Sequence, residues 1–206
     1  CLSFADKVPY ESVTVLPAVG NSPNAAVAAA RLGLKTALIT NLGADQNGAD
    51  ALTKLESEKV ATDFVTKHEG VITNYHYVLW YGDDRTILIK HEKYNYSLTD
   101  FAVPTGRQGN QKWIYLSSLG EHAFPEYSDK IIEYLEGHPE IKVAFQPGTF
   151  QIKAGTESLA RLYKRTEVFF CNVGEAKKIL KLEIGNEKLE IKKLLEGIKK
   201  LGPKLV

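Results

Sequence analysis

The side chains best suited to bind a small polar ligand come just before an alanine-rich segment. Gly20, Asn21 and Asn24 precede residues 25–30, which are five alanines and one valine. Asparagine amides donate and accept hydrogen bonds, N–H groups at a helix N-terminus point outward, and a glycine lets a ligand approach the main chain. We therefore expect a helix from about Asn24 to Leu32 with a ligand site ahead of it. The alternative is that Asn24 only caps a tightly packed helix.

An asparagine and a glutamate follow a second apolar run. Residues 168–170 predict a buried strand that leads into Asn172, and Glu175 falls in the first turn of the next helix. This arrangement puts an amide and a carboxylate at the carboxyl end of a parallel strand, where open α/β sheets bind ligands. The N-x-x-E spacing is also that of a capping box, in which both side chains serve the helix. The spacing alone leaves both interpretations open.

Apolar runs that suit short strands alternate with amphipathic patterns that suit helices. Strands are predicted at residues 36–40, 113–116, 143–145 and 168–170. Helices are predicted after an N-cap at Asp45 with Ala49, Leu52 and Leu55 on one face, from Ser128, at 156–164, from near Gly174 and at 187–201. Gly33 is expected to end the first helix in the left-handed conformation. The alternation predicts an α/β fold in which the four strands share one parallel sheet covered on both faces.

Two arms rich in tyrosine, tryptophan and isoleucine break this alternation around the turn at residues 82–85. They predict a β-hairpin, and residues 12–19 alternate similarly and could pair with it. A small sheet that stands off the main layer would form a lid from segments of about 8–19 and 72–96. One arm carries a stripe that either lines the lid or meets a partner: Tyr75, Tyr77, Leu79 and Tyr81.

Two histidines would face each other across this hairpin. His76 and His91 lie at matching distances from the turn. They could supply two ligands of a metal site, although such sites use three or four protein ligands. Cross-strand packing of the two rings is the favoured interpretation.

Composition and charge narrow the classes of function. The chain has 26 basic and 25 acidic residues, which argues against a nucleic-acid or anionic-membrane partner, and glutamates interrupt the lysine-rich segment 188–200. The apolar runs are too short to span a bilayer, and no secretory signal opens the sequence. Cys1 and Cys171 have neither zinc spacing nor a disulfide framework, which favours a reduced, cytoplasmic protein. No G-x-G-x-x-G motif follows a predicted strand, so dinucleotide binding is not indicated.

The asparagine-bearing stretches together resemble the PfkB family of sugar kinases, which includes ribokinase, fructokinase and adenosine kinase. Residues 19–48 look like the family's first signature: a glycine turn, an asparagine, an alanine-rich helix, a strand and then G-x-D-x-x-G. Residues 171–176 are similar to its N-x-x-E element, and residues 145–150 resemble its D-P-x-x-R region. The resemblance covers nearly the whole chain.

This resemblance implies a ribokinase-like three-layer α/β sandwich with a mainly parallel central sheet and a small β lid, of which residues 1–206 would be a part. It implies transfer of the γ-phosphoryl group of ATP to the hydroxymethyl group of a small sugar, with Mg²⁺. Gly20, Asn21 and Asn24 would line the sugar pocket. Asn172 and Glu175 would organise the nucleotide phosphates and Mg²⁺, which Glu175 would hold through water. In some members the lid also forms a homodimer.

Three departures from the family pattern bear on activity and substrate. The family's catalytic base is an aspartate in a G-A-G-D motif, which is not in this sequence, so we expect the base beyond Val206 and an inactive fragment. A start at Cys1, the lack of methionine and a strand-like end at residues 204–206 also suggest a longer parent, lacking here its first core strand or strands and its C-terminal half.

The other two departures leave the substrate open. Val19 stands before Gly20 where many members have two glycines, and Gln146 stands where an aspartate is common. Residues 116–122, which include Ser117 and Ser118, fall where sugar contacts occur in ribokinase-like proteins, and the sequence leaves the register of these contacts open. A nucleoside kinase of the adenosine kinase type and a non-catalytic sugar-binding or interaction module are the alternative functions.

Overall fold

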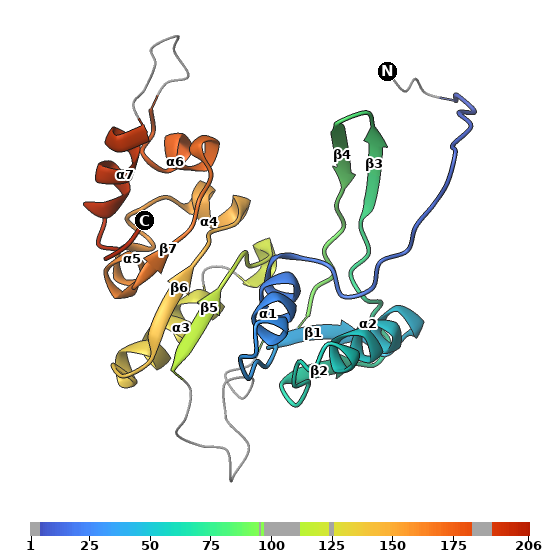
Figure 1. Ribbon diagram of the computed structural model, residues 1–206, viewed down its shortest axis with the longest axis horizontal. Coiled ribbons are helices and arrows are strands. Elements are labelled where there is room, and N and C mark those ends of the chain that lie inside the picture. Colours follow the sequence, from blue (N-terminus) through green and yellow to red (C-terminus); the bar gives the residue numbers. More distant parts are fainter. Residues whose placement is uncertain (1–4, 95, 97–111, 124–125, 183–190) are drawn as a thin grey trace.

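The computed structural model describes residues 5–94, 96, 112–123, 126–182 and 191–206 (Figure 1). Its helices are α1 (Asn21–Arg31), α2 (Gln46–Ser57), α3 (Glu126–Gly137), α4 (Thr149–Ala154), α5 (Ala160–Arg165), α6 (Val173–Ile179) and α7 (Ile191–Lys199), with a short 3-10 turn at Glu121–Ala123. Its strands are β1 (Thr40–Gly43), β2 (Val65–His68), β3 (Tyr77–Tyr81), β4 (Asp84–Leu88), β5 (Trp113–Leu116), β6 (Lys142–Phe145) and β7 (Val168–Phe169). The α/β class and the parallel pairing expected from the alternating pattern are confirmed.

The parallel strands form two ladders, not the single sheet that the sequence predicted. β5, β6 and β7 pair in that order, and Leu205 adds a parallel bridge to Val168, as the strand-like end of the chain predicted. The strand expected at 36–40 begins instead at Thr40, and it pairs with β2. β1, α2 and β2 form a β-α-β unit, so the backbone groups of β1 find their partner in the next strand along the chain.

One hydrophobic core joins the three-stranded sheet to the helices that follow it. Phe145 of β6, Phe169 of β7 and Tyr163 of α5 pack with ring centroids 5.4 to 5.9 Å apart. Leu135 of α3 and Ile198 of α7 belong to the same cluster and are completely buried. Burial in this cluster raises the pKa of Tyr163 to about 12. The apolar residues that predicted α3 therefore face the core. In α7, Leu194 and Ile198 face it as predicted, but Ile191 and Leu195 are exposed. Residues 187–190 lie outside the described residues.

The alanine-rich helix α1 packs against a second, smaller cluster. Ala26 and Ala30 contact a group formed by Leu38, Leu55 and Val60. Small side chains let α1 lie close to β1 and α2, so the alanines serve packing. After the helix, Gly33 has φ +88°, as its predicted role in the C-cap requires.

Two other helix predictions need correction. The helix expected at 156–164 is α5, which begins only at Ala160, and the sequence pattern missed α4. Gly155 separates the two with φ +86°. Asp45 caps α2 as predicted, but the buried residues of that helix are Gly48, Ala51 and Leu55, and Ala49 is exposed.

The β3–β4 hairpin stands away from both ladders (Figure 1). Tyr81 pairs with Asp84 around a two-residue turn, in which Gly82 has φ +58°. Every residue of both strands is exposed, including the tyrosine stripe of β3. Residues 12–19 form no strand, so the expected pairing with the hairpin is wrong. Pro17 lacks a backbone N–H, and a turn at Pro17 and Ala18 interrupts the alternating segment.

No helix within the described ranges combines the length and the apolar character that crossing a membrane requires.

Candidate active site

The N-terminus of α1 begins earlier than its sequence predicted. Gly20 is the N-cap, with φ 153° and ψ 173°, and Asn21 is the first helical residue. Asn24 is therefore not the N-cap, and its N–H donates to the Gly20 carbonyl at 2.9 Å. Pro23 explains the difference, because proline fits the first turn of a helix, where its missing N–H has no partner to lose. Both asparagine side chains are exposed.

This helix start meets the carboxyl end of β5. The Ser22 hydroxyl is hydrogen-bonded to the Ser117 hydroxyl, and Asn21 Nδ2 donates to Ser118 Oγ at 3.4 Å. Ser117 is 3% exposed, whereas Ser118 is open to solvent. The structure thus joins Asn21, a predicted sugar-binding residue, to Ser118, and it joins the neighbouring Ser22 to Ser117.

A buried glutamine that sequence reasoning missed ties the ends of β5 and β6 together. Gln151 Oε1 accepts from the Gly148 N–H at 2.7 Å and from the Leu119 N–H at 3.2 Å. Its Nε2 donates to the Ser117 carbonyl at 3.3 Å, and Gln151 is 1% exposed. A Cβ on Gly148 would lie 2.2 Å from Ser118 Cβ, so only glycine fits there. A long amide in the first turn of a helix after a strand was the available signal.

Gln146, which stands where the family often has aspartate, has a structural partner. The Tyr115 hydroxyl donates to Gln146 Oε1, and the Tyr115 ring lies 6.3 Å from the ring of Phe170. Burial raises the pKa of the Tyr115 phenol. The phenol therefore stays a neutral donor at physiological pH. Its hydrogen bond links the ends of β5 and β6, and its ring contact with Phe170 extends the link to the end of β7.

Asn172 and Glu175 form a reciprocal capping box at the start of α6. Asn172 Oδ1 accepts from the Glu175 N–H at 2.8 Å, and Glu175 Oε2 accepts from the Asn172 N–H at 2.9 Å. Within the described residues, the second carboxylate oxygen of Glu175 has no hydrogen-bond partner. Burial raises the pKa of the neighbouring Cys171 thiol, and the Glu175 charge adds to this effect. The thiol therefore stays neutral, which makes it a poor nucleophile.

One oxygen of Glu175 suits a cation held through water. The described side chains include no group of three His, Cys, Asp or Glu residues that could hold a metal ion directly. Mg²⁺ keeps several of its waters and often binds one or two carboxylates together with substrate phosphates. The free Glu175 oxygen fits this water-mediated mode.

The predicted site residues fall into two groups. Asn21 lies beside the end of β5, with Gly20 before it and Asn24 one turn behind it. Asn172 and Glu175 follow β7 at the same carboxyl edge of the β5–β6–β7 sheet (Figure 1). No hydrogen bond joins the two groups in the part of the chain that the structure describes.

The two histidines of the hairpin face each other as predicted. The rings of His76 and His91 lie 5.5 Å apart, and His91 also meets Phe150 edge-on at 6.0 Å. The described residues bring no third metal-binding side chain to this pair. The ring contacts of His91 with His76 and with Phe150 agree with the packing interpretation.

The sequence matches one protein family over nearly all of its length. The model of the pfkB family of carbohydrate kinases matches residues 4–206. The chain belongs to this family. No curated protein sequence matches the chain at a significant level.

Solved structures of PfkB-type sugar kinases share the fold. An uncharacterized sugar kinase from Pyrococcus horikoshii in complex with ATP is 23% identical, with a TM-score of 0.65, over 80% of this chain and 58% of that one. A fructokinase from Vibrio cholerae O395, bound to fructose, ADP and calcium, is 20% identical with a TM-score of 0.66, and the match covers 88% of this chain and 59% of that one. A PfkB protein from Polaromonas sp. JS666 is 16% identical with a TM-score of 0.69, and the match covers 89% of this chain and 63% of that one.

These likenesses confirm the ribokinase-like fold that the two signatures implied. This PfkB-family chain spans between 58% and 63% of the length of these three relatives.

Proposed function

We propose that the protein containing this chain transfers the γ-phosphoryl group of ATP to a hydroxymethyl group of a small sugar, assisted by Mg²⁺. The observation that carries the proposal is the junction of α1 with β5. There Asn21 and Ser22 meet Ser118 and Ser117 at the carboxyl end of a parallel strand, where open α/β sheets bind ligands. Membership of a carbohydrate kinase family supports the reaction class.

Each residue at the helix start has a separate part in this proposal. Asn21 and Asn24 present amides that orient sugar hydroxyls. Gly20 leaves the main chain open to the ligand. Ser22, held by Ser117, fixes the helix start against β5 and so sets the position of the amides.

The capping box at α6 belongs to the nucleotide side of the site. Asn172 orients the Glu175 carboxylate, whose second oxygen would hold Mg²⁺ through water. A bound Mg²⁺ would neutralise charge on the transferring phosphates. The proposed lid over the sugar consists of the segment of about 72–96, which contains the hairpin, together with a segment of about 8–19.

The proposal is tested by assaying the full-length protein with ATP and Mg²⁺ against ribose, fructose, 2-keto-3-deoxygluconate and adenosine. We expect turnover of at least one sugar and about a tenfold rise in its KM in Asn21→Ala, the cost of one lost hydrogen bond. Asn47→Ala, at an exposed asparagine of α2, is the matched control and should leave KM unchanged.

The other outcomes separate the alternatives. Turnover of adenosine alone would identify a nucleoside kinase, and sugar binding without turnover would identify a binding module. We also propose that residues 1–206 alone do not catalyse the reaction, because the aspartate that serves as base in the family is not among them. Loss of positioned acid–base help slows a reaction by about 10²- to 10⁴-fold. Turnover by this chain at the full-length rate would contradict that part.

Glu175→Gln should separate folding from cation binding. Glutamine can accept the Asn172 N–H as glutamate does, so the capping box and the melting temperature should persist. The negative charge is lost, so we expect apparent Mg²⁺ affinity or turnover to fall by about 10- to 100-fold, as for other outer-sphere groups. The measurement is a Mg²⁺ titration of initial rate with thermal unfolding of the same sample. An unchanged Mg²⁺ dependence would remove Glu175 from the proposed site.

A further inference from the structure

The base of the hairpin is fastened to the start of α2 by one threonine and one aspartate. Thr73 Oγ1 donates to Asp45 Oδ1 at 2.6 Å, and the Thr73 N–H donates to Asp45 Oδ2 at 2.9 Å. Thr73 Oγ1 also accepts from the Gly43 N–H at 3.0 Å, and Thr73 is 7% exposed. These bonds hold the pKa of the Asp45 carboxyl below its usual range. The carboxylate is therefore ionised at neutral pH, as an acceptor of several donors must be.

The glycines of the G-x-D-x-x-G motif make room for this contact. A Cβ on Gly43 would lie 2.2 Å from the Val71 carbonyl oxygen. A Cβ on Gly48 would lie 2.2 Å from the Gly43 carbonyl oxygen and 3.0 Å from Thr73 Oγ1. The segment that enters the hairpin therefore crosses directly over the backbone of the motif. Its first and last glycines permit this crossing, and its aspartate fastens it.

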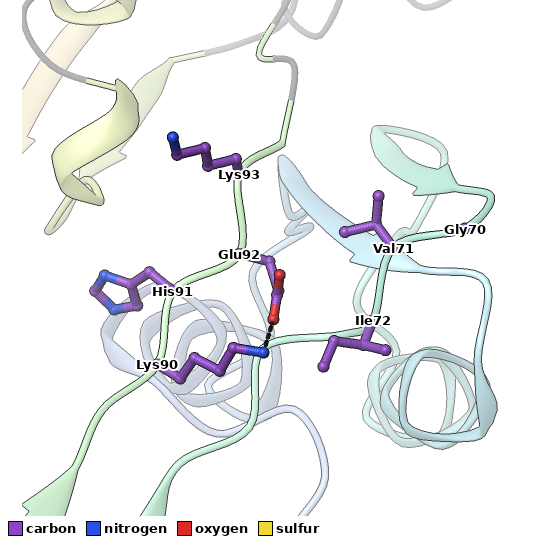
Figure 2. A pocket seen from close by; sticks show the side chains of 7 residues that line it. All are labelled: Gly70, Val71, Ile72, Lys90, His91, Glu92 and Lys93. Carbon is purple, nitrogen blue, oxygen red and sulfur yellow. Dashed lines mark ion pairs between the residues drawn. The ribbon is translucent and has the colours of Figure 1, made fainter.

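Hydrogen bonds join the entering segment to the segment that leaves the hairpin. Asn74 Oδ1 accepts from the Glu92 N–H at 2.7 Å. The Tyr94 hydroxyl donates to the Ile72 carbonyl at 2.9 Å and accepts from the Asn74 N–H at 3.2 Å. Between these segments lies a pocket of about 600 Å³, lined by residues 70–72 and 90–93 (Figure 2). Because this open space separates the segments, their relative position depends on these bonds and on Tyr94, which is 6% exposed and packs against the ring of His68.

The leaving segment passes beside the candidate sugar site. His91 packs on Phe150, and a Cβ on Gly120 would lie 3.7 Å from His91 Nδ1. Gly120 and Phe150 are each two residues from the groups that shape the end of β5, Ser118 and Gly148. Since every residue of β3 and β4 is exposed, the hairpin takes its direction from its base.

We propose that Asp45 and Thr73 are positioning residues that fix the hairpin over the sugar site. The part that concerns the sugar rests on the proposed function. Neither side chain needs to touch the sugar. The bonds hold the entering segment, the entering segment holds the leaving segment through Asn74 and Tyr94, and the leaving segment lies against the loops that end β5 and β6.

The test uses Asp45→Asn, Thr73→Val and Thr73→Ser in the full-length protein. Amide hydrogen exchange of residues 71–74 and 90–94 should become about tenfold faster in Asp45→Asn and Thr73→Val, while exchange in α3 stays unchanged. The KM for the sugar should rise about tenfold, and the KM for ATP should not change. Thr73→Ser keeps the hydroxyl, so both the exchange rate of these segments and the KM for the sugar should stay at their wild-type values. Asp50→Asn is the matched control, because within the described residues that exposed carboxylate accepts only from Gln46, on its own helix.

The outcomes distinguish this proposal from the proposed function. Exchange that stays slow in Asp45→Asn and Thr73→Val overturns the proposal, whether or not the protein turns over a sugar. Faster exchange with an unchanged sugar KM also overturns it, because the bonds would then serve only local stability. A parent protein that turns over no sugar contradicts the proposed function, and the exchange of the two segments alone then decides whether the hairpin base is held as described.

Discussion

Gln151→Leu is expected to lower the free energy of unfolding by about 3 to 5 kcal/mol, because each buried polar group left without a partner costs about 1–3 kcal/mol. Leucine fills a similar volume but makes none of the three hydrogen bonds of Gln151. Gln151 is 1% exposed, and without it the N–H groups of Gly148 and Leu119, which are partly buried, and the buried carbonyl of Ser117 would lose their partner. Denaturant unfolding with an unchanged m-value measures the loss.

Two further variants check the cause of that loss. Gln151→Glu keeps an acceptor for both N–H groups, but at neutral pH it buries a carboxylate against the Ser117 carbonyl, so it should also be destabilised. Acid pH should relieve part of that loss, because the protonated carboxyl can donate to Ser117. Gln46→Leu changes an exposed glutamine of α2 and should stay within about 0.5 kcal/mol of wild type. If Gln151→Leu were as stable as wild type, the hydrogen bonds of Gln151 would not be what joins the ends of β5 and β6.

Gly43→Ala should destabilise the protein by about 3 kcal/mol, at the upper end of typical overpacking costs. The new methyl group would lie 2.2 Å from the Val71 oxygen and 2.6 Å from two further backbone atoms of Ile72 and Thr73. Backbone cannot turn aside as a flexible side chain can, so the segment that enters the hairpin must shift. The melting temperature should fall by about 6–12 °C for a chain of this size.

Gly137→Ala provides the matched control for this prediction. Apart from the neighbouring residues and the backbone of α3 itself, the described residues place no atom within 4 Å of a Cβ at Gly137, which ends α3 without a positive φ. The same change should therefore be neutral there, or stabilise by up to about 1 kcal/mol. Equal melting temperatures for Gly43→Ala and wild type would contradict the close crossing at Gly43.

Features that depend on neighbouring residues were predictable from the sequence. Asp45 caps α2, Gly33 ends α1 with positive φ, and the hairpin turns at Gly82. Each depends on backbone preferences within a few residues. The α/β class followed in the same way, from the alternation of short apolar runs with amphipathic ones.

Features that depend on distant partners were not predictable. β1 pairs with β2 and does not join the β5–β6–β7 sheet. The spacing of apolar residues predicts that a strand is buried, but it does not tell which strand becomes its neighbour. Asn24 is not the N-cap that its residue type predicts, because Pro23 favours a helix start ahead of it. Gln151 bonds to groups 32 and 34 residues earlier in the chain, and no pattern of spacing reveals such a pair.

The candidate site also has a part that was predictable from the sequence and a part that was not. Its residue types were predictable, because polar side chains after apolar strands are visible in the sequence. The contacts of Asn21 with Ser118 and of Ser22 with Ser117 span more than ninety residues, so they required the folded chain.

The reciprocal bonds of Asn172 and Glu175 have a consequence for how such motifs diverge. Each side chain closes an open end of α6, so natural selection for a stable fold preserves the pair even after selection for catalysis ends. A descendant that had become a silent pseudoenzyme would still carry N-x-x-E. Genome surveys that seek active kinases should therefore give more weight to residues with a smaller share in folding, such as the exposed Asn24, since these drift first when catalysis is no longer required.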